Sequence, residues 1–131
     1  MRAIARETLA ALIVLLVLVG LPSAAVAYEK AFAQQFTATV WARIPERGGF
    51  SPYEIRVRQG ERVRLRVIGD DMVHGFAIPE LGVLVRELKR GEETIVEFTP
   101  ERPGRFRFMC AVICSPLHGR MTGEVVVQPK S

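Results

Sequence analysis

Four side chains with soft metal-binding atoms lie within one short segment near the C-terminus. Cys110, Cys114, His118 and Met121 form the pattern Cys-x3-Cys-x3-His-x2-Met. Thiolate, imidazole and thioether groups are ligands that suit copper, and a weakly bound methionine is typical of copper centres that transfer electrons. The segment is therefore predicted to bind copper.

A mononuclear electron-transfer copper site takes one cysteine, two histidines and a weak methionine. The second histidine of this chain is His74, in the segment Asp-Met-Val-His-Gly-Phe at residues 71–76, from which a strand could carry it to the loop. The extra thiolate favours a different site, because Cys110 and Cys114 can bridge two copper ions, each completed by one histidine and one weaker ligand. Two ions that share one unpaired electron change little in geometry on oxidation, which favours fast electron relay.

These motifs resemble the CuA domain of cytochrome c oxidase subunit II, which nitrous oxide reductase also carries. The resemblance covers about residues 50–127 and includes Val-His-Gly-Phe at 73–76, Arg-Pro-Gly at 102–104 and the complete ligand loop. It implies an all-β fold, a Greek-key cupredoxin β-sandwich, and two bound copper ions. The ligands that it implies are Cys110 and Cys114 as bridges, His74 and His118 as terminal ligands, Met121 as the weak ligand of one copper, and the backbone carbonyl of Val112 as that of the other.

The resemblance also implies an electron-transfer subunit. It would accept electrons from a soluble donor, such as a cytochrome c or another cupredoxin, and pass them to the haem-copper catalytic subunit of a terminal oxidase. The sequence shows no nucleophile paired with a general base, no paired carboxylates and no phosphate-binding loop. The chain alone is therefore not expected to turn over a substrate. Two alternatives remain, namely the CuA subunit of a haem-copper nitric oxide reductase and a periplasmic copper carrier or chaperone.

The chain departs from the family at two points. Val112 replaces an acidic residue with which many members hold a magnesium ion, so no magnesium is expected here. The aromatic residues through which many members take up electrons are represented only by Trp41 and Phe50. The route of electron uptake therefore stays open.

Two structural interpretations compete with a copper site. Two cysteines in an exported chain commonly form a disulfide, and two cysteines with two histidines can hold zinc. Neither interpretation gives Met121 a role, and a disulfide needs neither histidine. Met72 and Met109 are predicted to be core residues, because methionine near a strand usually fills apolar space.

Alternating residues indicate the elements that would hold the site. Apolar and polar residues alternate at 36–42, 54–58 and 62–68, and five arginines between 56 and 66 occupy the polar face. Further strands are predicted at 73–78, 83–88, 94–99, 105–109 and 123–127, with a loop at 43–52 that is rich in proline and glycine. This pattern predicts a β-sandwich at residues 36–131, preceded by a connector at 28–35.

The formal net charge is +4, but the arginine face is interpreted as solvated strand surface and no nucleic acid partner is expected. A basic surface repels a basic cytochrome c, so a neutral or acidic donor fits better. The N-terminal residues 1–27 contain an uncharged stretch after Arg2 and Arg6, which predicts one hydrophobic helix. It is either a membrane anchor or a signal peptide cleaved after Ala-Val-Ala at 25–27. Both place the copper domain on the periplasmic side of the cytoplasmic membrane.

Overall fold

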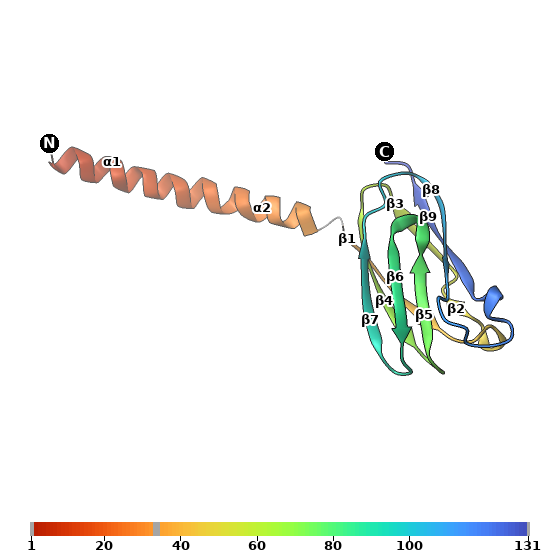
Figure 1. Ribbon diagram of the computed structural model, residues 1–131. Coiled ribbons are helices and arrows are strands. Elements are labelled where there is room, and N and C mark those ends of the chain that lie inside the picture. The colour runs from red at the N-terminus through yellow and green to blue at the C-terminus, as the bar shows by residue number, and fades with distance from the viewer. Residues whose placement is uncertain (1, 33–34, 131) are drawn as a thin grey trace. The chain divides into compact units, whose positions relative to one another are not determined.

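The computed structural model describes residues 2–32 and 35–130, which belong to two separate units, one N-terminal and one C-terminal (Figure 1). The N-terminal unit is a run of helix made of α1 (Arg2–Leu15), a π-helical turn (Leu16–Gly20) and α2 (Leu21–Phe32). Its stretch Thr8–Tyr28 has a mean hydropathy of 2.7, and none of it is buried. By length and composition it could span a membrane. The predicted connector at 28–35 begins as helix, and its residues 33 and 34 lie outside the described residues.

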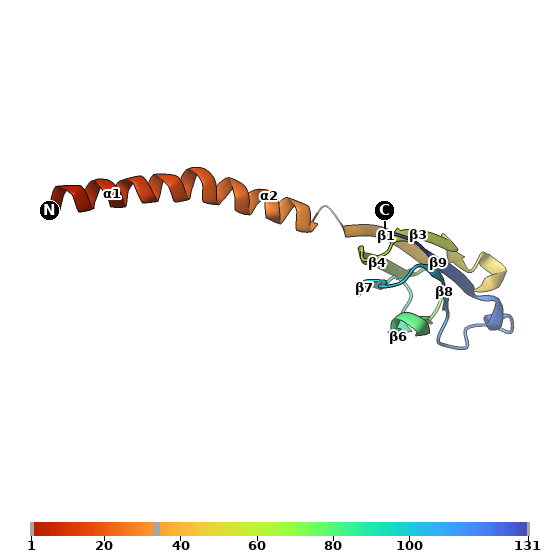
Figure 2. The same cartoon turned by 90° about the horizontal axis from the view of Figure 1, so that it is seen from above.

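The second unit is a sandwich of two β-sheets (Figures 1 and 2). One sheet has the strand order β2-β1-β4-β7 and the other β3-β9-β8-β5-β6. The strands are β1 (Gln35–Ala42), β2 (Phe50–Ser51), β3 (Glu54–Arg58), β4 (Arg62–Gly69), β5 (His74–Ile78), β6 (Val83–Leu88), β7 (Glu93–Phe98), β8 (Gly104–Met109) and β9 (Thr122–Gln128). The predicted all-β sandwich is confirmed.

Apolar residues and arginines alternate along β4, which gives the strand one buried face and one exposed face. Val63, Leu65 and Val67 are buried between the sheets, whereas the intervening arginines are exposed. These arginines pair across the sheet with β7, for example Arg66 with Glu93 at 2.5 Å between nitrogen and oxygen. Exposed pairs of this kind contribute little to stability, because water and salt screen the attraction between the charges. The arginine face is thus a solvated sheet surface, as the alternation predicts.

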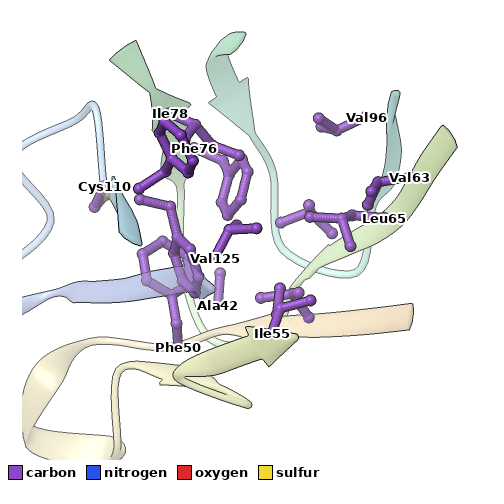
Figure 3. Close-up of a cluster of buried hydrophobic side chains, with 14 of the residues drawn as sticks. Ala42, Phe50, Ile55, Val63, Leu65, Phe76, Ile78, Val96, Cys110 and Val125 are labelled. Atoms are coloured by element: carbon purple, nitrogen blue, oxygen red, sulfur yellow. The ribbon is translucent and has the colours of Figure 1, made fainter. Parts of the chain in front are cut away.

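The core lies between the two sheets and contains a group of packed aromatic rings. Phe50, Phe76 and Phe108 form a cluster with ring centroids 5.3 to 5.6 Å apart. Figure 3 shows Phe50 and Phe76 among the buried apolar side chains, with Cys110 at the edge of the group. Buried aromatic packing fixes the strands that carry the candidate ligands, because interiors of this density resist displacement.

One predicted position is wrong. Met72 was expected in the core, but 41% of its surface is exposed. It lies in the bend between β4 and β5, where no sheet covers it. Met109, in contrast, is partly buried at the end of β8.

Candidate metal centre

The ends of three strands of one sheet bring the candidate ligands together. His74 is the first residue of β5, Cys110 follows β8, and Met121 precedes β9. The Cys110 N–H donates to the Met121 carbonyl oxygen at 3.1 Å, which closes the base of the loop. Inside the loop, a 3-10 turn (His118–Arg120) ends with the Met121 N–H bonded to the His118 carbonyl at 2.9 Å. The loop is the blue segment at the lower right of the domain in Figure 1.

The two thiols lie at the centre of this group. Cys110 and Cys114 are both buried and free, with their Sγ atoms 3.9 Å apart. A disulfide bond would need a sulfur separation of about 2.05 Å. The two sulfurs instead face each other as separate thiols at about van der Waals distance.

The remaining donor atoms divide into two sets, one around each sulfur. His74 Nδ1 lies 3.9 Å and the Val112 carbonyl oxygen 3.1 Å from Cys110 Sγ. His118 Nδ1 lies 3.8 Å and Met121 Sδ 3.6 Å from Cys114 Sγ. The structure therefore brings together all six positions that the sequence singled out, with one imidazole and one weaker donor beside each thiol.

Burial and charge keep the second thiol protonated in this arrangement. Burial, followed by the nearby Cys110 thiol, raises the pKa of the Cys114 thiol to about 11. A cation bound between the sulfurs would compensate the negative charge of the Cys114 thiolate, which burial otherwise disfavours.

Asp71 orients the buried histidine. Its Oδ1 lies 2.7 Å from His74 Nε2, while its Oδ2 accepts the Ile44 N–H at 3.0 Å and lies 3.8 Å from an Arg47 nitrogen. Burial raises the pKa of Asp71, but the hydrogen bonds from His74 and from the Ile44 backbone outweigh it, so the net shift is downward. An ionised carboxylate only accepts hydrogen bonds, so His74 Nε2 carries the proton and Nδ1 offers its lone pair to the thiol side.

The role of Asp71 is not evident from its position in the sequence alone. The sequence does place the Asp71 carboxylate three residues before His74, a candidate ligand, and this spacing could have indicated its role. Its two other partners are Ile44, which precedes a 3-10 segment (Pro45–Arg47) after β1, and Arg47, which ends that segment. Only the fold brings that turn to the bend before β5.

A close backbone approach fixes the distance between the two ligand-bearing segments. A Cβ atom placed on Gly75 would lie 2.7 Å from Ala111 Cβ and 2.9 Å from the Ala111 nitrogen. The Gly75 N–H also points at Cys110 Sγ, 3.4 Å away. Glycine at this position therefore allows β5 and the ligand loop to touch directly.

Comparison with known proteins places this fold and site in a family. The sequence model of the family described as "cupredoxin-like domain" matches residues 9–127. The chain belongs to the cupredoxin-like family. Its donor set fits copper, because His74 is fully buried and both thiols have ligand atoms within 4.8 Å of it. Cupredoxin membership and this cluster together support copper binding.

Individual relatives define the relationship further. Cytochrome c oxidase subunit 2 of Thermus thermophilus is 34% identical over 80 residues, which are 61% of this chain and 58% of that protein. The chain thus spans less than two thirds of this relative's length. The periplasmic domain of subunit II of cytochrome oxidase from Bradyrhizobium japonicum superposes with a TM-score of 0.60 at 20% identity, covering 72% of this chain and 85% of that one.

A third similarity extends over almost the whole chain. A chain from the structure of a heme-copper terminal oxidase dimer superposes with a TM-score of 0.63 at 19% identity. The superposition covers 94% of this chain and 99% of that one. The chain is therefore a cupredoxin with homology to cytochrome c oxidase subunit II, as its motifs indicate.

Proposed function

We propose that this chain is an electron-transfer protein whose domain at residues 36–131 holds a binuclear copper centre. The observation that carries the proposal is the division of the donors into two sets around the two thiols. A mononuclear site with Cys114, His118 and Met121 would leave Cys110 and the Val112 carbonyl without a role. Two ions use every donor in the cluster.

Each residue has a distinct part in this proposal. Cys110 and Cys114 would bridge the ions, and His74 and His118 would complete one ion each. Met121 and the Val112 carbonyl would serve as the weak ligands. A bound copper pair supplies one-electron redox chemistry, and the chain contributes a rigid, buried cradle that holds the same ligand positions in both oxidation states.

The proposed partner is the haem-copper catalytic subunit of a terminal oxidase, to which this chain would pass electrons from a soluble donor. Homology to a cytochrome c oxidase subunit 2 supports this role. The apolar helix Thr8–Tyr28 is compatible with a position beside a membrane-embedded partner. The copper domain is proposed to face the periplasm.

The full chain in detergent micelles, loaded with copper, tests the centre directly. We expect two coppers per chain and an electron paramagnetic resonance spectrum of seven hyperfine lines, because the unpaired electron is shared equally by two nuclei. Cys110→Ser should reduce the content to at most one copper and give four lines. Two coppers with an unchanged spectrum in Cys110→Ser would refute the bridging role.

The same preparation distinguishes the alternatives. One exchangeable Cu(I) without a reversible potential in the wild-type chain would indicate a copper carrier. If the binuclear centre forms, affinity purification of the tagged chain from membranes should recover a haem-containing partner. Oxygen and nitric oxide consumption by that complex then separates an oxidase from a nitric oxide reductase.

A further inference from the structure

A cleft of about 240 Å³ opens beside the ligand loop, at the end of the domain that carries the candidate metal centre. One wall comes from the segment that includes the turn after β1 and the residues around β2. The other comes from the last part of the ligand loop. The residues that line the cleft include Pro45, Phe50, Tyr53, Leu117, Arg120 and Thr122. In Figures 1 and 2 the two wall segments, coloured yellow and blue, lie at the same end of the domain.

Arg120 carries the only charge among the residues that line this cleft. Its side chain has no ion pair or hydrogen bond with any described residue, whereas the nearby Arg43 and Arg47 are paired with Asp70 and Asp71. Glu46 is exposed beside the cleft but does not line it. A guanidinium without a partner favours a carboxylate, which it can bind through two parallel hydrogen bonds.

The rest of the cleft is suited to an apolar stem attached to that carboxylate. Pro45, Phe50 and Leu117 supply apolar side chains, and Tyr53 and Thr122 also line the cleft. Tyr53 is 71% exposed and Leu117 38% exposed. Exposed aromatic and apolar residues around an unpaired cation are typical of a surface that another protein covers.

The cleft adjoins a candidate copper ligand. Leu117 and Arg120 enclose His118 in one turn, which the Arg120 N–H closes by donating to the Leu117 carbonyl at 2.8 Å. On the other side of that turn, His118 Nδ1 faces Cys114 Sγ. Ile113, on the same loop, is 86% exposed but does not line the cleft. A protein bound here would lie one side chain away from the proposed centre.

We propose that this cleft docks the soluble electron donor, with an aspartate or glutamate of the donor on Arg120 and its apolar surface over Leu117 and Pro45. The proposal rests on the proposed electron-transfer function and adds the chemistry of the donor. The docking surface selects an acidic protein, because Arg120 offers the unpaired charge. A basic donor would place like charges together at this point.

Stopped-flow reduction of the copper-loaded full chain tests this choice, with reduced acidic plastocyanin and reduced basic cytochrome c as the two probes. Arg120→Glu should lower the second-order rate constant with plastocyanin about tenfold at low ionic strength, and Arg120→Lys should stay within about threefold of wild type. Arg58→Glu is the matched control, because Arg58 is exposed before the turn to β4, away from the ligand loop, and the same net charge is removed. It should change the rate less than about twofold.

A binding measurement on the metal-free chain separates the docking site from the electron-transfer function. Adding plastocyanin to the isotope-labelled full chain should shift amide resonances at residues 45–53 and 117–122, whether or not copper binds. Shifts confined to other surfaces, or equal rate losses in Arg120→Glu and Arg58→Glu, would overturn the docking proposal. Failure to load two coppers while these shifts persist would overturn only the proposed function.

Discussion

At the scale of single residues, the hydrogen bond between Asp71 and His74 fixes which imidazole nitrogen faces the thiols. Asp71 is held in place by the Ile44 N–H at 3.0 Å, so the carboxylate cannot turn away without losing a backbone partner. A fixed carboxylate fixes the ring and its tautomer, and it makes the metal-facing nitrogen more basic. Asp71 therefore acts on the proposed centre through His74.

Asp71→Asn should weaken copper binding by about 10-fold or more, the range seen when outer partners of ligating histidines are removed. The amide has the same shape but no charge. Its NH₂ group is a hydrogen-bond donor and would face a second donor, either the Ile44 N–H or the His74 N–H. Competition with a Cu(I) chelator measures the affinity. Asp70→Asn is the matched control, since Asp70 pairs with Arg43 and is partly exposed. Equal losses in both variants would exclude a specific role for Asp71.

The Cys114 thiol gives a pH prediction for the metal-free chain. Its pKa is raised by burial and by Cys110 from 9.0 to about 11, so the folded state retains the proton where the unfolded chain releases it. The unfolded state then binds fewer protons, and the free energy of unfolding falls as pH rises from about 9 to about 11.

Two measurements check this. Alkylation of Cys114 by iodoacetamide, followed by mass spectrometry of the metal-free chain, should accelerate with a midpoint near pH 11. Denaturant unfolding should show the stability loss over the same range, and Cys114→Ser should lose less stability over that range. A midpoint below pH 9 would show that the thiol ionises readily in the folded chain.

The sequence indicates which donor side chains the fold brings together, because their spacing is local and their chemistry is distinctive; that they bind metal stays a prediction. Cys110, Cys114, His118 and Met121 lie in one loop, and the fold brings them together as the spacing requires. Asp71 was not singled out, since its partner Ile44 approaches only in the folded chain. Met72 was misplaced, because the period-two alternation that identifies buried strand positions does not apply in a bend.

At the scale of elements, strands with clear alternation are found within about one residue of their predicted bounds. The prediction at 54–58 coincides with β3, and that at 36–42 lies within β1. The two-residue strand β2 was missed inside the predicted loop at 43–52. A strand of that length has no alternation to detect, and its pairing with Trp41 and Ala42 of β1 depends on the return of the chain through the turn.

The start of β5 and the ligand loop are joined by the contact at Gly75. Gly75→Ala should reduce copper binding and lower the free energy of unfolding by about 1 to 3 kcal/mol, because the added methyl group overlaps the Ala111 backbone. Chelator competition and denaturant unfolding measure the two effects.

Gly119→Ala provides the control within the ligand loop itself. A Cβ at Gly119 meets no atom within 4 Å, so this variant should keep both stability and copper. If Gly75→Ala behaves like Gly119→Ala, the strand and the loop are not in the direct contact that the geometry indicates.

At the scale of the whole molecule, the N-terminal helix decides whether the copper domain is tethered. The helix continues through the Ala-Val-Ala segment at 25–27 and on to Phe32. The stretch Thr8–Tyr28 is apolar throughout and of a length that crosses a hydrocarbon core. Homology to an oxidase subunit is compatible with a domain that stays attached to the membrane beside its partner.

We expect the chain to remain in the membrane fraction after alkaline washing, with its first residues intact. Ala27→Leu, which removes the small residue that a signal peptidase requires, should then leave the chain uncleaved, as in the wild type, and should not change its distribution. A wild-type chain found in the soluble periplasm with Tyr28 as its first residue, alongside a membrane-bound Ala27→Leu variant, would contradict anchoring. In that case a freely diffusing copper domain would have to reach its partner by collision, and the docking surface around Arg120 would have to serve two proteins in turn.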